Sequence, residues 1–195
     1  MAKYKYIPKE VRMKITKKRI IIFSIAAILL TLLYVSFPYI QEWYKSSQPL
    51  TEINYFGVPM KFREDIRLAK NIPVYPNDDY IKSIFRNKDL KGITISILNT
   101  TNQTNIIGVE AVEITFKLST FYNLAGLPIA IKGKEVSSFF QIQGNKTNPT
   151  IVIIPPIAAN ETVVRAENYT VIISGKNLKD LDLATIKFIT IVLGI

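Results

Sequence analysis

Cysteine and histidine are both absent from this chain of 195 residues. Without them there can be no disulfide bond, no zinc finger, no haem held by either residue and no cysteine-ligated iron–sulfur cluster. Nucleophiles of the Ser-His-Asp and Cys-His kinds are excluded for the same reason. We therefore expect no metal, no cofactor and no enzymatic activity, and the only hydrolytic routes left open are a serine–lysine pair or paired carboxylates.

Neither of these routes has a clear sequence signature. The segment Ser46-Ser47-Gln48-Pro49 follows an apolar run, as the nucleophile of signal peptidases does, but it lacks their Ser-Met-x-Pro setting. The carboxylate pairs Asp78-Asp79 and Asp180-x-Asp182 fall at an expected helix start and an expected turn, where such side chains accept backbone hydrogen bonds. A hydrolase is therefore the least favoured class.

The positive charge is concentrated at the N-terminus. Of the 25 basic residues, eight lie in residues 1–19 beside a single acidic one, Glu10, which gives this segment a charge of +7. The other 176 residues carry 17 basic and 14 acidic groups, or +3. A nearly balanced body with a basic tail is typical of membrane topology rather than of a nucleic-acid-binding surface, so we expect no nucleic-acid partner.

Residues 20–41 contain no charge and are long enough, at roughly 33 Å as a helix, to cross a bilayer. Basic residues precede this run and aromatic residues end it, which predicts a cytoplasmic N-terminus and an exported C-terminal part. The residues expected to set this topology are Lys14, Lys17, Lys18, Arg19, Trp43 and Tyr44. A cleaved signal peptide and a buried core helix are the alternatives; the long basic region and the missing A-x-A-like site favour an uncleaved anchor.

Five N-x-T glycosylation patterns follow the apolar run. With 13 Asn and 25 Ser plus Thr in the whole chain, about 1.7 patterns ending in Ser or Thr would be expected by chance. Their asparagines are Asn99, Asn102, Asn145, Asn160 and Asn168. All of them lie in the part expected outside the membrane, which favours an extracellular glycoprotein.

The spacing of apolar residues changes at residue 92 and divides the exported part in two. Residues 42–91 read as a linker with two short helices, near 59–70 and after Pro76, with Asn77 or Asp78 as the second cap. From residue 92 onward we expect strands rich in Ile, Val and Thr, separated by turn residues, at 92–99, 107–119, 128–132, 135–143, 150–154, 162–174 (two strands) and 184–193. The expected fold is therefore mainly β, an immunoglobulin-like antiparallel sandwich over 92–195.

Apolar residues stand where a polar loop would be usual, at Phe121, Tyr122, Leu124, Leu127 and Ile129. Such a loop either contacts a partner or folds over the end of the sandwich. The last expected strand is apolar on both faces, with Ile186 and Phe188 opposite Ile189, Ile191 and Leu193, so it should be central in the sheet or covered by another subunit.

The sequence thus predicts a single-pass protein of the cell membrane with a cytoplasmic tail (1–19), an anchor (20–41), a juxtamembrane region (42–91) and an extracellular domain (92–195). Its partners would be the bilayer and another protein. Its function would be to bind or tether a cell-wall layer, a filament or a neighbouring surface protein; the alternative is a non-catalytic accessory subunit of a respiratory oxidoreductase or transporter. The layout resembles the anchored sandwiches of prokaryotic surface machines such as archaellum or pilus anchors, and 32 isoleucines would suit a thermophilic archaeon.

Overall fold

The computed structural model describes residues 51–98, 104–136 and 143–195. The expected anchor at 20–41, the basic tail and the aromatic residues at 43 and 44 lie outside this part, as do Asn99 and Asn102. Among the described residues, no helix combines the length and the apolar composition needed to cross a membrane. Contacts divide the chain after Gln48, and every described residue belongs to the second unit, Pro49–Ile195, which we call the α/β unit.

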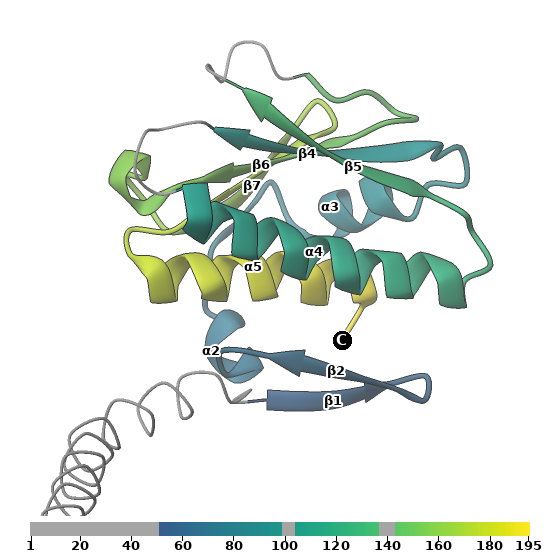
Figure 1. Ribbon diagram of the computed structural model, residues 1–195, viewed down its shortest axis with the longest axis horizontal. Coiled ribbons are helices and arrows are strands. Elements are labelled where there is room, and N and C mark those ends of the chain that lie inside the picture. Colours follow the sequence, from purple (N-terminus) through teal and green to yellow (C-terminus); the bar gives the residue numbers. More distant parts are fainter. Residues whose placement is uncertain (1–50, 99–103, 137–142) are drawn as a thin grey trace, which may run out of the picture. The chain divides into compact units, whose positions relative to one another are not determined.

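A six-stranded mixed sheet forms one layer of the α/β unit (Figure 1). Its strands are β3 (Val74–Tyr75), β4 (Gly92–Leu98), β5 (Ala130–Val136), β6 (Thr150–Ile154), β7 (Val163–Glu167) and β8 (Thr170–Ser174). The spatial order is β3-β7-β8-β6-β4-β5. The strands β8, β6, β4 and β5 run parallel to one another, whereas β7 is antiparallel to β8 and parallel to β3.

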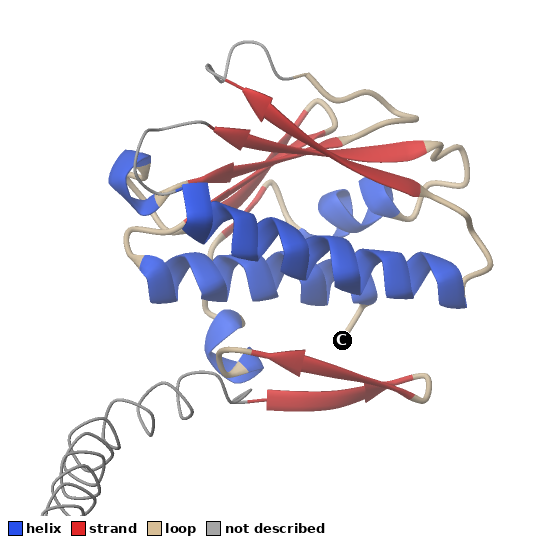
Figure 2. Ribbon diagram, viewed as in Figure 1, coloured by secondary structure: helices blue, strands red, loops and turns tan. Residues whose placement is uncertain are grey.

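Helices cover one face of this sheet (Figure 2). They are α3 (Asp78–Phe85), α4 (Thr104–Leu124) and α5 (Leu178–Leu193), with the short α2 (Ile66–Ala69) packed against α5. A hairpin of β1 (Thr51–Tyr55) and β2 (Val58–Phe62) lies on the side of the helices away from the sheet. A single hydrophobic core joins all three layers, because Phe62 of the hairpin, Phe188 of α5 and Ile151 of β6 are buried in the same cluster.

The expected sandwich is therefore wrong in its architecture, although many of its strands are present. Residues 92–98 and 150–154 are strands, and 162–174 forms two strands with Asn168 at the turn between them. The segments 107–119 and 184–193 are helical instead of extended. Helix α4 connects the parallel neighbours β4 and β5, so the fold is mixed α/β.

The helix after Pro76 is confirmed. The Asn77 side chain accepts a hydrogen bond from the backbone N–H of Tyr80 at 2.8 Å, and Ile81, Ile84 and Phe85 form its buried face. The helix expected near 59–70 is mostly wrong, because its first half is strand β2 and only Ile66–Ala69 is helical. Both α2 and α3 pack against α5, and β3 joins the sheet, so these juxtamembrane elements form part of the α/β unit.

Residues 184–193 are apolar on both sides because α5 lies between the sheet and the hairpin. Eleven of its sixteen residues are buried, and Phe188 and Ile189 are both fully enclosed although they are adjacent in sequence. A helix surrounded on all sides has no polar face and therefore no visible 3.6-residue period. No second subunit is needed to cover this segment.

Candidate binding surface

Helix α4 has its charged residues inside and apolar residues outside. Its only charged residues are Glu110, Glu113 and Lys117, whose side chains are 3%, 10% and 5% exposed. The large apolar residues exposed on the same helix are Val109 (47%), Val112 (68%), Phe116 (63%) and Leu124 (46%). We call these four residues the α4 outer face. A surface helix normally has the opposite arrangement, so the α4 outer face is a candidate contact surface.

The buried charged residues of α4 meet charged residues from two other segments. Arg63, which follows β2, donates from Nη2 to Glu110 Oε1 and from Nε to Glu113 Oε2, both at 3.0 Å. Its Nη1 lies 3.7 Å from Oδ1 of Asp182 in α5. Lys117 Nζ pairs with Glu113 on the adjacent helical turn and lies 4.3 Å from the centre of the Phe62 ring. We call these five charged residues the Arg63 cluster.

Burial changes the protonation of the Arg63 cluster. Loss of solvation, together with the neighbouring Asp182 carboxylate, raises the pKa of Glu110 to about 8. Burial also lowers the pKa of Lys117, an effect that the Glu113 carboxylate partly offsets. Glu110 is therefore mostly protonated at neutral pH.

The chemistry open to the Arg63 cluster is limited, because Glu110 and Lys117 are almost inaccessible to a substrate. Among the described residues, no group of three or more acidic side chains is arranged to hold a metal ion. The pair Asp180 and Asp182 is split: Asp180 accepts a hydrogen bond from Thr162 at 2.9 Å, and Asp182 faces Arg63. We infer that the cluster orients α4 by joining it to α5 and to the segment after β2.

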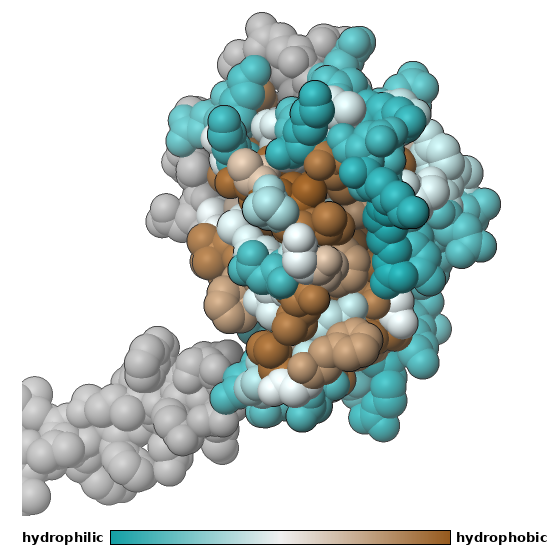
Figure 3. Space-filling model, turned by 90° about the vertical axis from the view of Figure 1, so that its right-hand side faces the viewer, coloured by the Kyte–Doolittle hydropathy of each residue, from teal (hydrophilic) through white to brown (hydrophobic). Residues whose placement is uncertain are grey.

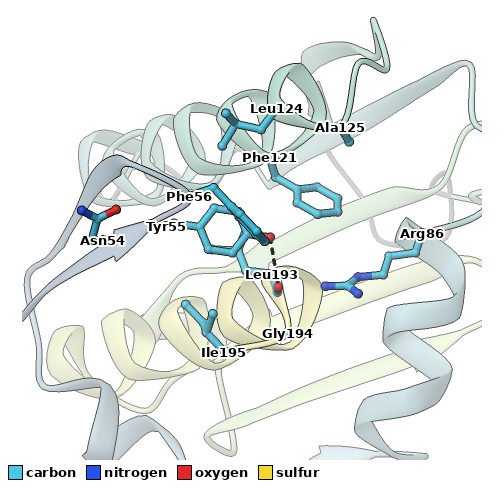
Figure 4. Close-up of a pocket in the computed structure, with 10 residues that line it drawn as sticks. All are labelled: Asn54, Tyr55, Phe56, Arg86, Phe121, Leu124, Ala125, Leu193, Gly194 and Ile195. Atoms are coloured by element: carbon cyan, nitrogen blue, oxygen red, sulfur yellow. Dashed lines mark hydrogen bonds between the residues drawn. The ribbon is translucent and has the colours of Figure 1, made fainter.

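A cavity of about 740 Å³ opens at the C-terminal end of α4 (Figure 4). We call it the α4-end pocket. Its lining consists of Asn54, Tyr55, Phe56, Arg86, Phe121, Leu124, Ala125, Leu193, Gly194 and Ile195. These residues come from the β1–β2 hairpin, the end of α3 and the ends of α4 and α5. In the space-filling view of this side of the molecule, hydrophobic side chains form an almost continuous band (Figure 3).

Among the described residues that line the α4-end pocket, only Arg86 has a charged side chain. Its Nε donates to the carbonyl of Val192 at 2.9 Å, and its guanidinium carbon lies 5.5 Å from the centre of the Phe121 ring. Burial raises the pKa of Tyr55, and the positive charge of Arg86 opposes that rise. The Tyr55 hydroxyl donates to the Leu193 carbonyl at 3.2 Å, so hydrogen bonds fix two of the polar side chains around the pocket.

The structure separates the five residues expected to contact a partner. Phe121 and Leu124 line the α4-end pocket, and Leu127 is exposed just beyond it. Tyr122 lies in the core, where its hydroxyl donates to the Phe85 carbonyl at 2.7 Å, and Ile129 is half-buried against that core. The segment is not a loop throughout, since α4 continues to Leu124.

The three described glycosylation patterns all lie at exposed connections between strands. Asn145 precedes β6, Asn160 precedes β7, and Asn168 occupies the β7–β8 turn with a φ of 44°. None of the three is on α4, so glycans on these asparagines would be attached outside the α4 outer face. Attachment of a glycan requires an exposed asparagine, and all three are exposed. That they carry glycans stays a prediction.

Sequence reasoning missed the Arg63 cluster and most of the α4 outer face. The spacing of Glu110, Glu113 and Lys117, three and four residues apart as on one face of a helix, could have identified α4 as a helix, but it could not have shown that this face is buried. Comparison of the chain with protein-family models, with curated proteins and with solved structures gives no match.

Proposed function

We propose that this chain is a non-enzymatic, single-pass membrane-anchored glycoprotein of the cell surface, whose exported α/β unit binds another surface protein through the α4 outer face. The single observation that carries the proposal is the inverted polarity of α4. Burying Glu110, Glu113 and Lys117 costs solvation energy, whereas exposing Val112 and Phe116 forgoes hydrophobic burial. A second protein covering the α4 outer face would recover that burial.

The uncharged run at 20–41 and the basic tail before it support the membrane anchor, and the exposed positions of Asn145, Asn160 and Asn168 support export. The partner would be a cell-wall layer, a filament or a neighbouring surface protein. An accessory subunit of a larger membrane complex is the second candidate, because permanent interfaces are the more apolar ones. The apolar segment at 184–193 no longer favours this candidate, because it is buried within its own unit, whereas the partly exposed apolar residues of 121–129 still do.

Charges introduced on the α4 outer face test the proposal. We expect Val112→Glu and Phe116→Glu each to reduce recovery of the partner from native membranes at least tenfold, because a buried unpaired carboxylate would oppose the contact. The matched control is Leu68→Glu, a similar change at an exposed leucine on α2. Thermal unfolding should change little in all three variants, since all three sites are on the surface. Unchanged recovery of the same identified partner with both α4 variants would contradict the proposal.

Peptide mapping of the protein from its native membrane tests export. We expect glycan masses on peptides containing Asn145, Asn160 or Asn168, each lost in the corresponding Asn→Gln variant. The membrane-bound chain should also retain residues 20–41. Unmodified sequons in a chain that is protected from protease on the outside of sealed cells would contradict export, and a mature chain beginning near residue 40 would replace the anchor with a signal peptide.

A further inference from the structure

The α4-end pocket has the properties of a ligand site that is separate from the α4 outer face, although Leu124 borders both. Its volume, about 740 Å³, lies within the range of roughly 300–1,000 Å³ typical of small-molecule sites. Phe56, 80% exposed, lines it from the β1–β2 hairpin, and Phe121 and Leu124 line it from α4 (Figure 4). An aromatic ring exposed to this extent gains from any apolar ligand that covers it.

Arg86 supplies one fixed positive charge at the edge of this apolar space. The hydrogen bond from its Nε to Val192 and its packing over Phe121 hold the guanidinium in place. Within the described part of the chain, its Nη1 and Nη2 atoms have no hydrogen-bond or ion-pair partner, although Nη2 packs beside Gly194. A planar guanidinium with two free nitrogens suits a carboxylate or phosphate oxygen pair.

The polar groups around the pocket favour an alkyl chain over a peptide. The Tyr55 hydroxyl is already used by Leu193, and Asn54 Oδ1 already accepts from the N–H of Gly57 at 2.7 Å. An inserted peptide would bring backbone amides that need partners, and unpaired buried amides are costly. An alkyl chain brings none.

We propose that the α4-end pocket binds a single-chain amphiphile with one anionic head group. The head group pairs with the Nη atoms of Arg86, and the chain lies against Phe56, Phe121 and Leu124. This inference is independent of the protein partner proposed for the α4 outer face, because either could fail while the other holds.

Photoaffinity labelling of the full-length chain in phosphatidylcholine nanodiscs tests the site. The probe is tetradecanoic acid carrying a diazirine on its chain, and adducts are mapped by peptide mass spectrometry. We expect adducts at residues 54–56 and 121–125. Unlabelled tetradecanoate should displace the probe, and the neutral methyl tetradecanoate should need at least about tenfold more, because it lacks the charge that Arg86 binds.

Variants separate the charge from the apolar walls. Arg86→Gln should raise the tetradecanoate concentration needed for displacement at least about tenfold. Leu124→Asp should abolish labelling of the pocket, because it puts a carboxylate against the alkyl chain. Arg67→Gln is the matched control, since Arg67 is an exposed arginine on α2 paired with Asp65. Circular dichroism of each variant checks that the fold is retained.

Three outcomes would overturn the proposal. The first is adducts spread over the unit that tetradecanoate does not displace. The second is equal displacement by tetradecanoate and its methyl ester, which would leave an apolar cavity without a role for Arg86. The third is stronger displacement by an apolar tripeptide with a free carboxylate, which would assign the pocket to a peptide terminus.

Discussion

Replacing Phe188 with alanine is expected to destabilise the α/β unit by about 3–5 kcal/mol. Its ring is fully buried at the centre of α5 and makes an edge-to-face contact with Phe85, with ring centres 5.1 Å apart. The neighbouring change Ile189→Ala should cost about 2–5 kcal/mol, because Ile189 is also fully buried. Large losses at both adjacent positions are expected because α5 is buried on several sides; a segment with one solvent-facing side would lose much less at one of them.

Chemical denaturation of the full-length protein followed by far-ultraviolet circular dichroism would measure both losses. Leu178→Ala provides the control, because Leu178 is the exposed first residue of α5 and its truncation should cost less than about 1 kcal/mol. A loss near zero at either Phe188 or Ile189 would contradict the position of α5 between sheet and hairpin.

Stability should fall as the pH rises from about 4.5 to about 8. The pKa of Glu110 is raised to about 8 in the folded protein, so across this range the folded chain binds a proton that the unfolded chain has lost. The stabilisation associated with the neutral carboxyl is therefore complete below the unfolded pKa and lost as the pH passes through the folded pKa. The slope would be at most about 1.4 kcal/mol per pH unit, and the total a few kcal/mol.

Because the chain has no histidine, no imidazole contributes to the pH dependence of stability in this range. Glu110→Gln, which keeps the shape and removes the ionisation, should flatten the dependence between pH 5 and pH 8. Glu167→Gln, a change at an exposed glutamate on β7, should leave it unchanged. Equal slopes in the wild type and in Glu110→Gln, measured by denaturation at each pH, would contradict a buried neutral carboxyl at this position.

Local signals in the sequence predicted the elements that turn residues or a cap delimit. Strand β6 is a short apolar run bounded by turn residues, the β7–β8 pair is separated by a turn at Asn168, and α3 is capped by Asn77. Helix α5 was missed because its apolar residues surround it. Its caps were nevertheless present: Asn177 accepts from the N–H of Asp180 at 2.9 Å, and Gly194 ends the helix at a φ of 74°.

Helix α4 was missed for a different reason, because Val, Ile and Thr at 107–119 resemble a strand. Its buried residues Ile107, Ala111, Ile114, Leu118 and Tyr122 do follow helical spacing. The α4 outer face could not be recognised without the tertiary structure, since a sequence with apolar residues on one side and charges on another predicts the charges outside. Only the position of Arg63, about 50 residues away, makes the inverted orientation possible.

Site-specific photo-crosslinking along α4 in native membranes tests the central claim most directly. A benzophenone amino acid would replace Val109, Val112, Phe116 and, as buried controls, Ile107 and Ile114 in separate variants. We predict adducts to one and the same protein from the three outer positions and none from the two buried positions, which is the pattern of a helix face against a partner. Equal adducts from the outer and the buried positions, or no protein adduct from any outer position, would contradict a partner bound at the α4 outer face.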